Sequence, residues 1–232
     1  LYSQIIDKTI IVSSPETAEA TKLMENIFRA VNIAMVNELK LIFERMNINI
    51  WEVINAADSK PFGFMPFYPG PGMGGHCIPI DPFYLSWKAK EYNTEAKFIE
   101  LAGEINRKMT ENVAHRVGKA LNDHSKSIRN SNILVLGLAY KKDIDDMRES
   151  PSLKIIELLK FKGANIRYHD PYIKNTSKIE YVDLSKENLA VADAVLITTD
   201  HSNVDYEKVG KYAKLVIDCL LYTSDAADDG IR

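Results

Sequence analysis

The chain has 232 residues, of which 46% are apolar, 26% charged and 9% aromatic, and its formal charge is −3. This composition is typical of a folded protein of one or two domains and excludes a disordered tail or a fibre. Because 29 basic residues nearly balance 32 acidic ones, we expect no nucleic-acid partner, and no apolar stretch reaches the roughly 20 residues needed to cross a bilayer. With two cysteines, too few for a disulfide framework, we expect a cytoplasmic protein without a membrane partner.

The first residues predict a strand followed by a long helix. The β-branched run at residues 8–13 is typical of a strand. No partner strand precedes it, so we interpret residues 1–13 as the end of a domain that this sequence lacks. Ser14, Pro15 and Glu16 supply a capping hydroxyl, a proline for the first helical position and an acid in the first turn. Apolar residues then keep helical spacing for about eight turns, which predicts one long, largely buried helix.

A proline- and glycine-rich segment interrupts the helical part of the chain. Six prolines and five glycines lie within residues 60–82, a density that leaves no regular element. Helical spacing returns over about residues 93–121 and is broken by the polar run at 122–125. We therefore expect an all-helical central domain over residues 14–125 that carries a long loop.

The last hundred residues alternate between strand and helix patterns. Residues 133–138 and 165–169 are predicted strands on either side of an amphipathic helix at 151–162. Further strands at 194–199 and 214–218, with a short helix at 186–191, complete the pattern. This order predicts an α/β fold, a small doubly wound, Rossmann-like parallel-sheet domain at residues 130–218. Residues 219–232 lack this periodicity and are interpreted as a tail.

The glycines at residues 70–75 match the G-x-G-x-x-G spacing of a dinucleotide-binding turn. That turn needs a strand before it and a helix after it, whereas prolines and aromatic residues flank this one, so we reject a nucleotide fingerprint here. Glycine leaves the backbone free to approach a ligand closely. A substrate loop and an ordinary tight turn both remain open.

Cys77 follows these glycines directly, and Asp81 follows four residues later. Exposed amides and the neighbouring His76 favour the thiolate, which is the reactive form of cysteine. A small buried thiol that serves packing is the alternative. Because His76 and Cys77 are adjacent and no second ligand pair follows, zinc is disfavoured and no metal is expected.

Two other polar groups occupy positions where chemistry is possible. Lys22 and Asn26 share a face of the first helix, where a cation and an amide can hold a developing oxyanion; a solvated helix face is the alternative. Tyr140 and Lys141 follow the first strand of the α/β domain, at the edge where such folds bind ligands. Arg148, just before the next helix, could reach a phosphate. Surface charge is the alternative for these three residues.

Three segments carry a resemblance to a known family. They are Lys-Leu-Met-Glu-Asn at 22–26, Pro-Gly-Pro-Gly-Met-Gly-Gly-His-Cys-Ile-Pro-Ile-Asp-Pro at 69–82, and Gly-Leu-Ala-Tyr-Lys-Lys-Asp at 137–143 with Met-Arg-Glu-Ser-Pro at 147–151. Together they resemble the nucleotide-sugar 6-dehydrogenases of the UDP-glucose/GDP-mannose dehydrogenase family, over about residues 1–218. The residues around Cys77 are most similar to those of UDP-N-acetylglucosamine 6-dehydrogenases.

The resemblance implies an N-terminal NAD-binding domain, of which residues 1–13 would be the end. It also implies a helical middle that forms a homodimer and a C-terminal domain that helps to hold the UDP of the substrate. By motif, Cys77 matches the nucleophile, Lys22 and Asn26 the pair that assists at the C6 oxygen and the hydrolytic water, and Asp81 the acid that supports proton transfer. The other matches are the substrate-loop positions Phe67, Tyr68 and Gly74, the substrate-contacting positions Tyr140 and Lys141, and the cofactor-reaching Arg148.

Two departures from the family pattern accompany this resemblance. The cofactor fingerprint and the catalytic glutamate of the family's first domain have no counterpart here. Leu220 stands where the family has an arginine two residues past Asp218. We therefore interpret residues 219–232 as a tail outside the family pattern.

The resemblance leads to two hypotheses. In the first, the chain is the middle and C-terminal part of an enzyme that uses NAD to oxidise C6 of UDP-N-acetylglucosamine to the uronic acid, for surface polysaccharide precursors. The route is a cysteine thiohemiacetal and thioester. In the second, the chain binds nucleotide-sugar and dimerises without turnover. UDP-N-acetylmannosamine and UDP-glucose remain alternative substrates.

Overall fold

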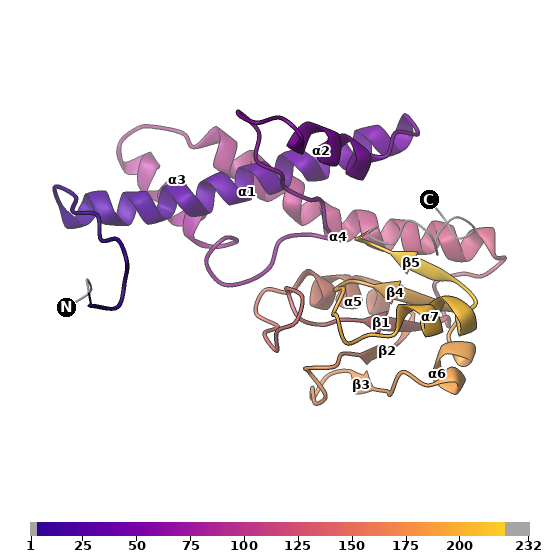
Figure 1. Ribbon diagram of the computed structural model, residues 1–232. Helices are drawn as coiled ribbons and strands as arrows, with labels where there is room; N and C mark the ends of the chain where they lie inside the picture. The colour runs from indigo at the N-terminus through magenta and orange to yellow at the C-terminus, as the bar shows by residue number, and fades with distance from the viewer. Residues whose placement is uncertain (1–3, 221–232) are drawn as a thin grey trace.

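The computed structural model describes residues 4–220 (Figure 1). Two long helices, α1 (Pro15–Arg45) and α4 (Lys97–Asp123), lie side by side across the molecule, and a parallel sheet lies beside the second half of α4. Within residues 4–220, no helix is both long and apolar enough to span a membrane. Of the tail proposed at residues 219–232, residues 221–232 lie outside the described residues.

The start of α1 is where the sequence predicts it. Ser14 is the N-cap, and its hydroxyl oxygen accepts a hydrogen bond from the backbone N–H of Thr17 at 3.2 Å, with proline at the first helical position. The strand predicted at residues 8–13 is wrong, because these residues form no ladder and Ile10 and Ile11 are exposed. A β-branched run becomes a strand only when a partner satisfies its backbone groups.

Opposite faces of α1 have different surroundings. Asn26, Ala30, Ala34, Asn37 and Lys40 form a buried face, on the side where α1 packs against α4. Residues spaced by four and seven along the other side remain exposed, and we call them the apolar stripe: Met24, Phe28, Met35, Ile42 and Met46. The prediction of a largely buried helix is therefore wrong for the single chain, since the face that carries the apolar stripe stays exposed.

Two short helices flank the loop that carries Cys77. α2 (Ile50–Asp58) begins at an Asn49 cap, and its Ile50 and Ile54 pack against Val36 of α1. α3 (Asp81–Glu91) begins with Pro82 in its first turn, where the missing N–H of proline costs nothing. Neither helix was predicted from the sequence. Residues 60–80 form no helix or strand, as their proline and glycine content predicts.

The C-terminal part of the chain is a five-stranded parallel sheet in the order β3-β2-β1-β4-β5. The strands are β1 (Asn132–Leu136), β2 (Asn165–His169), β3 (Glu180–Tyr181), β4 (Ala194–Ile197) and β5 (Val216–Asp218). The connecting helices are α5 (Pro151–Phe161), α6 (Lys186–Val191) and α7 (Tyr206–Tyr212). The expected doubly wound α/β domain is therefore confirmed, with the two-residue β3 and the short α7 as additions that periodicity did not reveal.

The core of the sheet domain includes part of α4. Val113, Val117 and Leu121 of α4 are buried with Ile133 of β1 and Ile155 of α5 on one face of the sheet. The other face is covered by α6 and α7, through Leu189 and Val209. Because α4 also packs along α1, a single helix fixes the helical domain relative to the sheet.

Gly137 ends β1 with a backbone conformation that requires glycine, and this generates a stability prediction. Its φ is +90°, and an added Cβ would lie 2.4 Å from the Cβ of Thr199. Gly137→Ala should lower the free energy of unfolding by about 3 kcal/mol, since a strained backbone and a buried overlap add together. Urea unfolding followed by circular dichroism measures this change.

Gly210 provides the matched control for Gly137. It lies in α7 with nothing within 4 Å of an added Cβ. Gly210→Ala should therefore leave the stability unchanged or raise it by up to about 1 kcal/mol. Equal midpoints for the two alanine variants would show that the Gly137 argument is wrong.

Candidate functional site

Cys77 lies in the last turn of the loop before α3. Its carbonyl oxygen accepts hydrogen bonds from the backbone N–H of Asp81 at 2.8 Å and of Ile80 at 3.2 Å, so the loop closes directly into the helix. The Cys77 side chain is exposed, whereas Cys219 at the end of β5 is buried. Exposure favours a reactive Cys77 over the alternative of a small packed thiol.

Asn26 and Asp81 meet beside this loop, although 55 positions separate them in the sequence. The side-chain N–H of Asn26 donates to Oδ2 of Asp81 at 2.8 Å, and the asparagine is 1% exposed. Lys22, one helical turn earlier, is exposed and pairs with Glu25 at 3.5 Å. Such a surface ion pair contributes little energy, so it leaves the Lys22 ammonium available to a ligand at this end of α1.

A buried pair of asparagines, Asn37 and Asn106, fixes the loop at Gly70. Oδ1 of Asn37 on α1 accepts from the backbone N–H of Gly70 at 2.9 Å. The Asn37 amide donates in turn to Oδ1 of Asn106 on α4, also at 2.9 Å. Both asparagines are buried, so the loop is tied to the α1–α4 interface at Gly70.

The glycines nearest Cys77 lie against the sheet domain. An added Cβ on Gly74 would be 2.6 Å from the Cβ of Tyr140 and 2.9 Å from the carbonyl oxygen of Glu149. Gly75 has a φ of +94°, and its N–H donates to the carbonyl of Arg148 at 3.1 Å. These glycines therefore allow a close approach of two protein segments. Cys77 is two residues after Gly75, which makes the hydrogen bond to the segment from Tyr140 to Arg148.

Arg148 is held by a residue that the sequence did not reveal as part of the site. Its guanidinium binds Asp146 in a two-pronged arrangement, with Nε at 3.1 Å from Oδ1 and Nη2 at 2.7 Å from Oδ2. These hydrogen bonds lower the pKa of Asp146 and raise the pKa of Arg148. Cys77 makes a smaller contribution that also raises the pKa of Arg148. The sequence signal that could have revealed this pair is an acidic and a basic residue two positions apart in a loop. Lys141 is exposed on the same segment.

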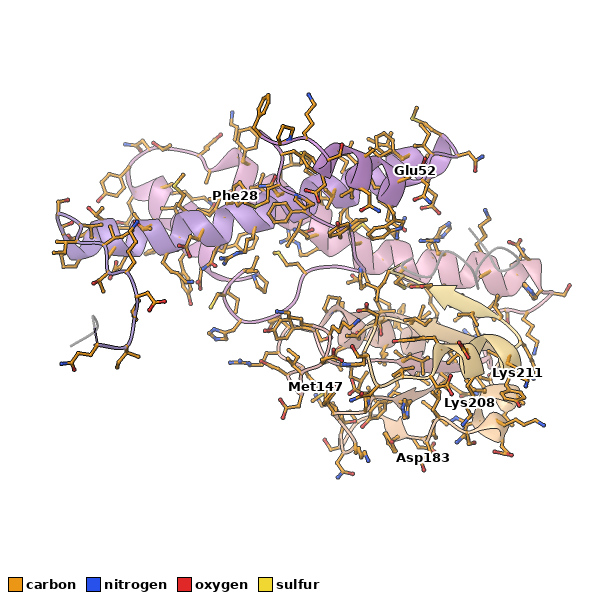
Figure 2. All side chains as sticks on the ribbon, in the orientation of Figure 1. Phe28, Glu52, Met147, Asp183, Lys208 and Lys211 are labelled. Atoms are coloured by element: carbon orange, nitrogen blue, oxygen red, sulfur yellow. The ribbon has the colours of Figure 1, made fainter. Side chains whose placement is uncertain are left out.

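Phe67 and Tyr68 contact the helical domain. The ring of Phe67 meets that of Phe28 edge-on, with centroids 5.6 Å apart, and Tyr68 stacks on Trp51 at 5.8 Å. Figure 2 shows Phe28 midway along α1 and Met147 at the edge of the sheet domain. Phe67 and Tyr68 therefore pack against the helical domain, and any contact with a substrate would be made in addition to these ring contacts.

The residues present do not fit a dinucleotide. Residues 70–75 have neither a strand before them nor a helix directly after them, so the pyrophosphate cradle is missing there. Among residues 4–220, no group of three or more histidine, cysteine, aspartate or glutamate side chains is arranged to hold a metal ion. Arg148 is the one predicted cofactor contact in the described part of the chain, and a single arginine does not bind NAD.

The two cysteines generate a reactivity prediction. Burial raises the pKa of Cys219 to about 12, so at pH 8 it is protonated as well as inaccessible. Iodoacetamide should therefore label about one thiol per native chain, at Cys77, and both thiols only in urea, as measured by mass spectrometry of the peptides. Cys77→Ser should abolish native labelling without changing the circular dichroism spectrum. Labelling of native Cys219 at a rate similar to that of Cys77 would contradict this assignment.

Comparisons with known proteins agree with this two-part architecture. The central-domain model of the UDP-glucose/GDP-mannose dehydrogenase family matches residues 16–108, and the family's UDP binding domain model matches residues 134–224. A UDP-N-acetyl-D-mannosamine dehydrogenase of Pyrococcus horikoshii is 37% identical over 223 residues, 94% of this chain and 51% of that protein. The chain thus spans about half the length of this relative.

Solved structures match over the same extent. The structure of UDP-D-ManNAc dehydrogenase from Pyrococcus horikoshii superposes with a TM-score of 0.86 at 35% identity, over 97% of this chain and 53% of that one. A UDP-glucose dehydrogenase from Pyrobaculum islandicum gives a TM-score of 0.82 at 27% identity, over 96% and 52% respectively. Because both domain models match in order and the fold agrees along nearly the whole chain, the chain belongs to the UDP-glucose/GDP-mannose dehydrogenase family.

Proposed function

We propose that this chain supplies the cysteine nucleophile and the UDP-binding surface of an NAD-dependent nucleotide-sugar 6-dehydrogenase. The observation that carries the proposal is the position of exposed Cys77 between two groups, the Asn26–Asp81 pair of the helical domain and the Tyr140–Arg148 segment of the sheet domain. A thiol between an amide–carboxylate pair and a basic, sheet-edge segment suits a substrate with a reactive carbon at one end and a pyrophosphate at the other.

In this reaction the Cys77 thiolate adds to the C6 aldehyde of the sugar to give a thiohemiacetal. Lys22 stabilises the oxyanion of each tetrahedral stage. Asp81 supports the transfer of protons, and Asn26, which is 1% exposed, acts through its hydrogen bond to Asp81. Water then releases the acid from the thioester. Two oxidations, of the C6 alcohol to the aldehyde and of the thiohemiacetal to the thioester, would each need one NAD as hydride acceptor. We assign the binding of NAD to a part of the protein outside the described residues.

The substrate is proposed to be a UDP-N-acetylhexosamine, and its oxidation would supply precursors of a surface polysaccharide. The residues around Cys77 favour UDP-N-acetylglucosamine, whereas the relative compared above is named for UDP-N-acetyl-D-mannosamine. A UDP-glucose dehydrogenase shares the fold at lower identity. We therefore rank UDP-N-acetylglucosamine and UDP-N-acetylmannosamine as the two substrates to compare, with UDP-glucose third.

A second function is favoured by the absence of a dinucleotide cradle from residues 4–220. In this alternative the chain by itself binds UDP-sugar and dimerises but performs no oxidation. The two functions make the same prediction for binding and differ only once the NAD-binding part is supplied.

We also propose that the chain forms a homodimer through the apolar stripe of α1 and the beginning of α4. The stripe runs from Met24 to the end of α1 on the side opposite its buried face, and Phe98 and Leu101 are exposed at the start of α4. A row of large apolar side chains on an exposed helix face is typical of a surface that a partner covers. A second copy supplies an identical stripe, which makes a symmetric interface self-complementary.

The binding proposal predicts a specific titration result. Calorimetry should show that the chain binds UDP and the UDP-N-acetylhexosamines, while incubation with NAD and UDP-sugar gives no absorbance of NADH. Lys141→Ala should weaken UDP binding by about tenfold, as expected for the loss of a charged contact to phosphate. Lys214→Ala is the matched control, because this exposed lysine precedes β5 at the opposite edge of the sheet.

Three results would count against the binding proposal. Undetectable UDP binding at millimolar ligand would contradict the UDP-binding assignment. Equal effects of the two lysine variants would contradict the assignment of Lys141. NADH production by the purified chain would show that the cofactor site lies within it.

The dimer proposal predicts the effect of a charge at the centre of the stripe. Met35→Glu should weaken self-association by at least about tenfold, since an unpaired carboxylate would be buried at the interface. Phe161→Glu is the control, because Phe161 is also a large, exposed apolar residue but lies on α5 in the sheet domain. Analytical ultracentrifugation measures both. A parent chain that is monomeric at tens of micromolar would rule the dimer out.

A further inference from the structure

A completely buried carboxylate lies at the carboxyl end of β2. Oδ2 of Asp170 accepts hydrogen bonds from the backbone N–H groups of Leu138 at 2.7 Å and Ala139 at 3.3 Å. Its Oδ1 accepts from the N–H groups of Tyr172 at 2.9 Å and Ile173 at 3.0 Å. A buried charge without a cation is stable only when donors surround it in this way.

The ionised state of Asp170 is secured by these bonds. Burial alone would raise its pKa, but the hydrogen bonds from His201 and from the backbone outweigh burial and lower the pKa to about 2. The carboxylate therefore stays charged throughout the neutral range and keeps its acceptors directed at Leu138 and Ala139.

His201, which follows β4, is equally buried and links Asp170 to the same segment. Its Nε2 donates to Oδ2 of Asp170 at 3.1 Å, and its Nδ1 accepts from the backbone N–H of Asp143 at 3.0 Å. Because a backbone N–H can only donate, Nδ1 carries no proton, and the ring is the neutral tautomer with its proton on Nε2. Asp143 has a φ of +59°, so this bond holds a backbone turn that is unfavourable for aspartate.

The segment that these two residues hold has little regular structure of its own. Residues 138–150 form no helix or strand, yet they include Tyr140, Lys141 and Arg148. Within the segment, the N–H of Tyr140 donates to the carbonyl of Asp146 at 3.0 Å. Tyr140 in turn limits the approach of Gly74 and Gly75 in the loop of Cys77.

We propose that Asp170 and His201 are positioning residues that fix the 138–148 segment and, through Tyr140, the loop that carries Cys77. Neither side chain reaches a ligand, since both are 0% exposed. Asp170 sets where the segment leaves β1, and His201 sets its turn at Asp143. Their consequence for UDP binding rests on the proposed function, whereas their effect on the segment does not.

The test compares two substitutions of His201 by hydrogen exchange and calorimetry. His201→Leu removes both hydrogen bonds, while His201→Gln keeps one donor and one acceptor. His201→Leu should increase amide exchange at Asp143 and Gly75 by at least about tenfold and weaken UDP binding by a similar factor. In His201→Gln, the amide exchange rates and the UDP affinity should both lie within about threefold of those of the parent. Urea unfolding reports global stability separately.

His169→Leu is the matched control. His169 lies next to Asp170 at the end of β2, and its ring Nδ1 forms a hydrogen bond with the carbonyl oxygen of Val182 at 3.0 Å. This variant loses a histidine at the same sheet edge without touching residues 138–148, so exchange at Asp143 and UDP affinity should match the parent.

The outcomes separate this inference from the proposed function. A parent chain that fails to bind UDP contradicts the proposed function, and the exchange measurements still decide the positioning role. Exchange at Asp143 that is unchanged in His201→Leu, or equally raised in His169→Leu, overturns the inference. If His201→Leu does not fold, the parent alone decides: an Asp143 amide that exchanges as fast as an unprotected peptide overturns it, and a protected one supports it.

Discussion

The burial of the second half of α4 in the sheet core is the packing interaction on which the rest of the structure depends. Val117 and Leu121 are 0% exposed between the sheet and α5, while the same helix packs along α1. Fixing both domains to one rigid helix determines where the loop of Cys77 and the carboxyl edge of the sheet meet. Together with the hydrogen bond from Gly75 to Arg148, this helix holds the two halves of the candidate site in one body.

The loop between the domains depends on contacts with its surroundings because its composition leaves few hydrogen bonds within it. Prolines remove donors and glycines add conformational freedom, so residues 60–80 are ordered by their surroundings. Asn37 binds the middle of the loop at Gly70, Arg148 accepts from Gly75, and α3 closes the end at Cys77. This distribution explains why Cys77 can be exposed and still have a defined position, which the proposed reaction requires.

Buried polar groups, rather than apolar packing, make these contacts specific. The Asn37–Asn106 pair, the Asn26–Asp81 pair and the Asp170–His201 pair each join elements far apart in the sequence. A buried amide or carboxylate that loses its partner costs more than an apolar contact of the same size. Each pair therefore favours one arrangement of the site over similar alternatives. The apolar stripe of α1, by contrast, lies on the face opposite these buried groups and is the surface that the proposed dimer would cover.

The sequence by itself determined the elements with strong local signals. Ser14 and Pro15 marked the start of α1, residues 165–169 and 186–191 were predicted with the bounds of β2 and α6, and the glycine-cysteine motif identified the family. Short elements such as α7 escaped, and the strand at residues 8–13 was wrong because pairing is a tertiary property. Only the tertiary structure decided that Asn26 meets Asp81, that Gly74 approaches Tyr140, and that Asp146 and the Asp170–His201 pair hold the segment opposite Cys77. Local spacing records which face of a helix or strand a residue occupies, whereas which faces meet depends on long-range packing that no short stretch of sequence contains.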